Sequence, residues 1–69
     1  QMDFKTFLKY AFDTSGLYRA QFATKINVSK PTLDNYLSGR TQPNYDDACK
    51  IIRLTGFHDV VITFKKDTE

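Results

Sequence analysis

The sequence predicts a mainly helical fold of four helices followed by a single C-terminal β-strand. Apolar residues recur every three or four positions through four stretches, each bounded by residues suited to helix ends. After Gly56 the run "VVITF" is β-branched and aromatic, and it is too short for a convincing helix. A chain of 69 residues buries only about 60% of its unfolded surface and forms one thin core. We therefore expect one domain over residues 2–66.

The first two helices are bounded by residues that suit their ends. Asp3 can cap the first helix and Gly16 can end it. A short second helix is expected over about Arg19 to Lys25, and Asn27, which tolerates left-handed backbone angles, follows where that helix stops. The expected apolar faces consist of Phe4, Phe7, Leu8, Ala11 and Phe12 in the first helix, and of Phe22, Ala23 and Ile26 in the second.

The third helix has both a start and a stop signal. Ser29 can act as its N-cap, and Pro31 falls in the first turn, where a missing N–H costs no hydrogen bond. Gly39 closes the helix, and residues 40–43 form a loop by composition. The expected inner stripe consists of Leu33, Tyr36 and Leu37.

The fourth helix is expected between Asn44, as N-cap, and Gly56. Asp46 and Asp47 fall in its first turn, where negative charge is favourable to the helix dipole. The apolar residues expected to face or flank the core are Tyr45, Ala48, Ile51, Ile52 and Leu54.

The strand is expected over residues 60–65, and no second stretch of the sequence has a comparable strand signal. A strand without a partner leaves its N–H and C=O groups unpaired. We therefore expect it to pair across a two-fold axis with the same strand of a second copy, because such pairing is antiparallel and self-complementary. The predicted dimer interface consists of Val60, Val61, Ile62, Thr63 and Phe64.

Residues 19–39 fit the pattern of a helix-turn-helix. Ala23 supplies the small residue at which two helices can cross, and Asn27 stands at the turn. Apolar anchors flank the turn and continue along the following helix. They are Phe22, Ile26, Val28, Leu33 and Tyr36. In this motif the second helix presents its other face to the major groove of double-stranded DNA.

The charge distribution agrees with a polyanionic partner. The net charge of the whole chain is only +2, but residues 19–40 carry four basic side chains against one acidic side chain. Residues 1–18 are neutral and residues 41–69 have a net charge of −1. The excess of positive charge therefore coincides with the helix-turn-helix pattern.

Residues 19–56 resemble the Cro and phage-repressor (XRE-type) family, which has the lambda-repressor-like fold. The resemblance lies in "QFATKINVSKPTLDNYLSGRTQP" followed by "ACKIIRLTG". It implies a small helical domain that binds operator DNA as a dimer, usually as a transcriptional repressor. Two features depart from the pattern. Asn27 replaces the usual glycine, and "HDVVITFKK" replaces the fifth helix and resembles the C-terminal strand by which some Cro proteins dimerise.

The outward residues of the third helix are the candidate contacts with bases. Lys30 can donate to guanine or to a phosphate, Asn35 can pair with adenine, and Thr32 can contact thymine. Pro31 can offer only apolar contact, so a thymine methyl suits it. Asp34 is expected either to accept from cytosine N4 or to orient Lys30 or Arg40.

Phosphate contacts are expected at both ends of this surface. Arg19 matches a position that commonly holds phosphate in the family, and Arg40 follows the third helix directly. The complete set of predicted DNA-binding residues is Arg19, Gln21, Ser29, Lys30, Pro31, Thr32, Asp34, Asn35, Ser38, Arg40 and Gln42.

The sequence contains few residues that would support an enzyme, a metal-binding protein or a membrane protein. The sequence offers no nucleophile paired with a base, no glycine-rich phosphate loop and no plausible carboxylate pair, so we expect no catalytic residues, cofactor or small-molecule substrate. Cys49 is the only cysteine and His58 the only histidine, which excludes an intrachain disulfide and the familiar zinc patterns. The sequence has no signal peptide or membrane span, so we expect a cytoplasmic protein at the nucleoid.

Together these features predict a sequence-specific transcriptional regulator that acts as a Cro-like homodimer on a palindromic operator. Two alternatives remain open. The chain can be a protein-interaction module whose strand is completed by a strand of another protein. It can also be the DNA-binding head of a larger regulator.

Overall fold

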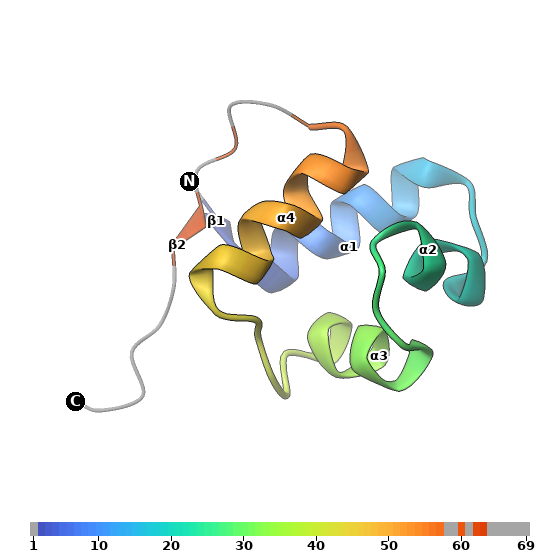
Figure 1. Cartoon of the computed structure of the whole chain (residues 1–69), viewed down its shortest axis with the longest axis horizontal. Helices are drawn as coiled ribbons and strands as arrows, with labels where there is room; N and C mark the ends of the chain where they lie inside the picture. The colour runs from blue at the N-terminus through green and yellow to red at the C-terminus, as the bar shows by residue number, and fades with distance from the viewer. Residues whose placement is uncertain (1, 58–59, 61, 64–69) are drawn as a thin grey trace.

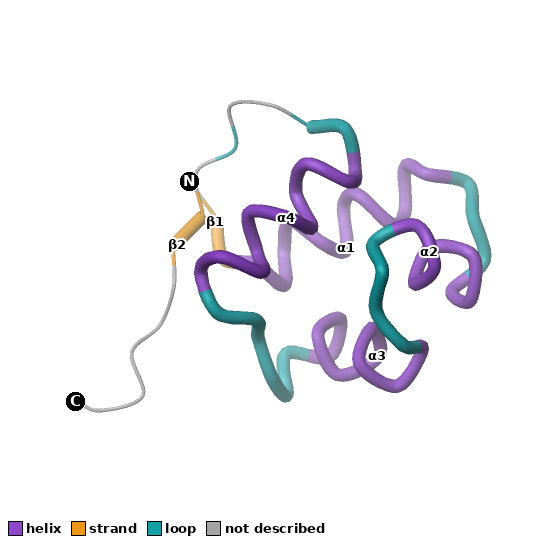
Figure 2. Tube along the Cα trace, viewed as in Figure 1, coloured by secondary structure: helices purple, strands orange, loops and turns teal. Residues whose placement is uncertain are grey.

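The computed structural model describes residues 2–57, 60 and 62–63, and in them it forms four helices beside a two-stranded sheet (Figure 1). The elements in chain order are β1 (Met2–Asp3), α1 (Phe4–Ser15), α2 (Arg19–Lys25), α3 (Lys30–Ser38), α4 (Tyr45–Thr55) and β2 (Ile62–Thr63). The four predicted helices are confirmed. Figure 2 shows the sheet at the opposite end of the molecule from α2. None of the described helices combines the length and hydropathy needed to cross a bilayer.

Side chains at three helix starts explain why the helices begin where they do. Asp3, Ser29 and Asn44 each accept a hydrogen bond from the backbone N–H three residues further on, at 2.9, 3.2 and 2.8 Å respectively. Each of these bonds satisfies a donor that the helix itself leaves unpaired. The three predicted N-caps are therefore confirmed.

The core is formed by one side of each helix. Its buried residues are Phe4, Phe7, Leu8, Ala11, Phe22, Ala23, Ile26, Leu33, Ala48 and Ile51. This agrees with the apolar faces predicted for the first three helices, in which Phe12, Tyr36 and Leu37 are partly buried against the core.

The prediction for α4 was wrong at two positions. Tyr45 is 68% exposed and Leu54 is 46% exposed, although both were expected to face or flank the core. The buried residues of this helix are Ala48 and Ile51. Tyr45 stands almost one turn before the first of them, and Leu54 lies about 120° around the helix from Ala48.

The turn between α2 and α3 has the predicted backbone conformation. Asn27 has φ 63°, and it is the only described residue other than glycine with a positive φ. The chain can therefore reverse direction within a few residues, and the N–H of Val28 returns to donate to the Ala23 carbonyl at 3.0 Å. Ala23 itself is 3% exposed, as a residue at a close helix crossing must be.

The expectation that the strand has no partner in its own chain was wrong. β2 pairs with β1 in parallel, with Met2 opposite Ile62 and Asp3 opposite Thr63. The partner escaped prediction because two residues directly before a helix give no strand signal. Of the strand predicted over residues 60–65, the described residues Ile62 and Thr63 form β2.

The remaining predicted strand residues fall in two groups. Val60 lies outside β2 and is partly buried against the core of its own chain. Val61, Phe64 and Lys65 lie outside the described residues.

Candidate nucleic-acid interface

One side of α3 is committed to the core, and this orients the whole helix. Leu33 is 0% exposed, and Tyr36 and Leu37 pack partly buried beside it. The Tyr36 ring meets the Phe4 ring edge-on, with centroids 5.7 Å apart. Both α1 and α2 contact α3. Because packing fixes this side, the opposite side of α3 faces away from the core.

The first turn of α3 presents the predicted base contacts outward. The Lys30 side chain is 56% exposed, and Pro31 is exposed beside it. Thr32 is half-buried, and its hydroxyl accepts a hydrogen bond from the Ser29 hydroxyl at 2.9 Å. Ser29 thus caps the helix and orients the Thr32 hydroxyl, whose own proton can still be donated. Asn35 is half-buried and lies on the next turn.

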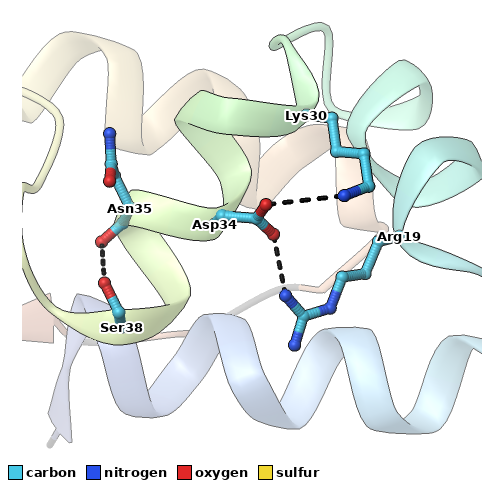
Figure 3. A network of polar contacts seen from close by, with 5 residues as sticks. All are labelled: Arg19, Lys30, Asp34, Asn35 and Ser38. Carbon is cyan, nitrogen blue, oxygen red and sulfur yellow. Dashed lines mark hydrogen bonds and ion pairs between the residues drawn. The ribbon is translucent and has the colours of Figure 1, made fainter.

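A network of charges crosses from α2 to α3. Arg19 Nη1 donates to Asp34 Oδ1 at 2.8 Å, and Lys30 Nζ lies 3.6 Å from Asp34 Oδ2 (Figure 3). The predicted pairing of Asp34 with Lys30 is present in the structure. The second partner is Arg19 on the neighbouring helix, whereas Arg40 was the residue named from the sequence. Figure 3 also shows the Asn35 amide pointing away from this network.

Two predicted DNA-binding residues make hydrogen bonds at helix ends. Gln21 Oε1 accepts from the Tyr18 N–H at 2.9 Å and so completes the start of α2. The Ser38 hydroxyl donates to the Asn35 carbonyl at 3.1 Å and accepts from the Arg40 N–H at 3.4 Å. Both residues remain exposed, but helix capping alone is a sufficient reason for their presence.

An open concavity of about 670 Å³ adjoins the end of α3. It lies between the start of α1 and the loop that leads into α4. Its lining residues are Asp3, Lys5, Ser38, Gly39, Arg40, Thr41, Gln42, Pro43 and Asn44. Arg40 and Gln42 were predicted from the sequence, but Lys5 was not. A Cβ built on Gly39 would lie 2.9 Å from Lys5 Cδ, so α1 brings this additional cation to the end of α3.

The ionisable groups behind this surface favour a structural role. Partial burial, and secondarily the Asp47 carboxylate, raises the pKa of Tyr36 above its ordinary value of 10.0. The phenol therefore stays neutral at physiological pH, as its position against the core requires. Within the described part of the chain, no three His, Cys, Asp or Glu residues gather closely enough to hold a metal ion.

The succession of α2, a left-handed turn and an α3 packed on one side defines a helix-turn-helix protein. The family model described as a helix-turn-helix domain matches residues 9–62. The chain belongs to this family, in agreement with the resemblance to Cro and phage repressors. The partner that such a domain implies is DNA. Comparison with curated proteins and with solved structures gave no significant match.

Proposed function

We propose that this chain is a sequence-specific transcriptional regulator that binds double-stranded DNA through α3 and represses by occupying a promoter. The observation that carries the proposal is the division of α3 into two sides. Leu33 is fully buried, while Lys30 and Pro31 are exposed on the helix that the motif places in the major groove. The net charge of +3 over residues 19–40 supports the same surface. This is the role that the resemblance to Cro-like phage repressors implies.

The base contacts that we propose follow from the donors and acceptors that α3 presents. Lys30 would donate to guanine O6 and N7, and the Asn35 amide would pair with adenine N6 and N7. Thr32, positioned by Ser29, would offer its hydroxyl and methyl to thymine, and Pro31 would meet a thymine methyl.

The phosphate contacts that we propose lie on either side of those bases. Arg19 begins α2 and Arg40 follows α3, so the two cations lie at separate points of the surface. The Lys5 side chain, next to Gly39, adds a third cation near Arg40. The further polar candidates are Gln21, Ser29, Ser38 and Gln42.

The experiment that tests the proposal is selection of bound duplexes from a random pool. A sequence-specific regulator enriches one short motif, and the motif should contain the guanine or adenine positions that Lys30 and Asn35 can contact. A pool that gains affinity without gaining a motif would contradict the proposal. A chain that enriches no duplex at all would favour the protein-interaction module instead.

We further propose that two copies bind together on a two-fold symmetric operator. A dimer with one α3 per major groove requires half-sites roughly 34 Å apart, so the selected motif should be an inverted repeat with that spacing. The contact that we propose is made by residues 60–64. β1 pairs along one edge of β2, and the other edge of β2 would pair with the second copy.

The dimer contact is testable separately from DNA binding. Ile62→Asp places a charge in the proposed contact and should convert a dimer to a monomer in sedimentation equilibrium. A variant with the same mass as the unaltered chain would exclude pairing through this segment. Lys50→Gln, on the exposed surface of α4, makes the same change of −1 in net charge and is the matched control.

A further inference from the structure

Two cations of the helix-turn-helix are not independent, because they pair with the same carboxylate. Arg19 Nη1 lies 2.8 Å from Asp34 Oδ1, and Lys30 Nζ lies 3.6 Å from Asp34 Oδ2 (Figure 3). Asp34 is the only acidic residue among residues 19–40, which contain four basic residues. One carboxylate therefore engages half of the positive charges of the segment that faces DNA under the proposed function.

The two pairs differ in how firmly they hold the cation. The contact with Arg19 has the length of a charge-assisted hydrogen bond, and it joins residues 15 positions apart on two helices. Because a guanidinium has five N–H donors, Arg19 can keep this bond and donate to a phosphate at the same time. Lys30 lies beyond hydrogen-bond distance, so the charge of Asp34 steers its ammonium without fixing it.

The solvent exposure of the network limits its value for folding. The side chains of Arg19 and Asp34 are 53% and 38% exposed, and ion pairs at such sites contribute little to stability. Water and salt screen the pair, but a DNA duplex brings phosphates that compete directly for the same two cations. The network is therefore placed to influence binding more than folding.

We infer that Asp34 is a specificity-determining residue that works by restraining Arg19 and Lys30, an inference that rests on the proposed function. In the free protein it holds Arg19 of α2 by a hydrogen bond and keeps Lys30 of α3 nearby. DNA in the correct register can use that arrangement, and part of the entropy of ordering the two side chains, chiefly that of Arg19, has then already been lost. Random DNA gains less, because Asp34 keeps the two cations from reaching whichever phosphates are nearest. Its own negative charge also repels every phosphate.

The test compares the unaltered chain with Asp34→Asn, which removes the charge and keeps the shape. Dissociation constants are measured for a selected duplex and for a random duplex over a range of salt concentrations. Asp34→Asn should bind the random duplex up to about tenfold more tightly at about 0.1 M salt, with a salt slope steeper by ~1. The selected duplex should gain less, so the ratio between the two dissociation constants should shrink. Asp34→Glu keeps a carboxylate and should retain most of the ratio.

Asp13→Asn is the matched control, because it makes the same change in net charge at an exposed position on α1. It should change binding of both duplexes by the same small factor. Asp34→Ser provides a second neutral variant, and circular dichroism with urea unfolding confirms that each variant is folded. An Asp34→Asn variant whose ratio equals that of Asp13→Asn would overturn the inference.

The failure of this inference is distinguishable from failure of the proposed function. If the unaltered chain binds selected and random duplexes equally, both the proposed function and the role of Asp34 are wrong. If the unaltered chain discriminates between them and Asp34→Asn discriminates equally well, only the role of Asp34 is wrong.

Discussion

The buried and exposed sides of α3 differ in what holds their residues in place. Leu33 is 0% exposed and is fixed by packing, whereas Lys30 is steered by one ion pair at 3.6 Å. Burial of a leucine contributes about 1.5–3 kcal/mol, but an exposed ion pair contributes only about 0–1 kcal/mol. The outer residues of α3 can therefore change with little effect on the stability of the fold. Under the proposed function, a surface that must match one DNA sequence among many needs this freedom.

The largest expected effect tests the buried side. Leu33→Ala leaves a cavity beneath α3 and should lower the free energy of unfolding by about 2–5 kcal/mol. Urea unfolding followed by circular dichroism measures it. Leu54→Ala is the matched control, since Leu54 is 46% exposed, and it should change the free energy by less than about 1 kcal/mol. Equal losses in the two variants would show that burial does not distinguish Leu33 from an exposed leucine.

An intermediate effect is expected at the turn between α2 and α3, which sets the direction of α3 and so of its buried and exposed sides. Asn27 has φ 63°, a conformation that costs most side chains about 1–2 kcal/mol. Asn27→Ala should lower the free energy of unfolding by about 1 kcal/mol, measured by urea unfolding. Asn27→Gly should be nearly neutral or slightly stabilising, because glycine adopts this conformation readily. If the Asn27→Ala variant were as stable as the Asn27→Gly variant, the left-handed backbone conformation would not determine which residues are tolerated at position 27.

The smallest expected effect concerns Tyr36, which is partly buried against the core at the edge of the inner side of α3. The pKa of Tyr36 is raised by partial burial and by Asp47, so the folded state favours the neutral phenol. The resulting stability is fully present below the unfolded pKa of 10.0 and is lost as the pH rises through the higher folded pKa. Unfolding measured from about pH 9 to 11 should show this decline, and Tyr36→Phe should reduce it. Replacing the exposed Tyr18 by Phe should leave the decline in place.

The features that were predictable from the sequence depend on residues close together in the chain. Asp3, Ser29 and Asn44 each cap a helix through an N–H only three residues away, so residue type and position are sufficient to identify them. The left-handed turn at Asn27 is equally local. The periodic apolar residues add the inner faces of the helices, because helical spacing alone determines which residues share a side.

The features that escaped prediction depend on tertiary packing. Arg19 and Asp34 meet across 15 residues, and Lys5 reaches Gly39 only because α1 packs against α3. The pairing of Met2 with Ile62 spans almost the whole chain, and although the β-branched run marks Ile62, no local signal marks Met2. The same dependence explains Leu54, whose apolar character was mistaken for burial.

That α3 reads base sequence from its exposed side is tested most directly by Asn35→Ala. The measurement is the dissociation constant for the selected duplex and for a set of duplexes that differ from it by one base pair. We expect the variant to lose about 1–3 kcal/mol of affinity for the selected duplex and to lose its preference at one position, with unfolding unchanged. A folded variant that keeps the same preference at every position would contradict the assignment.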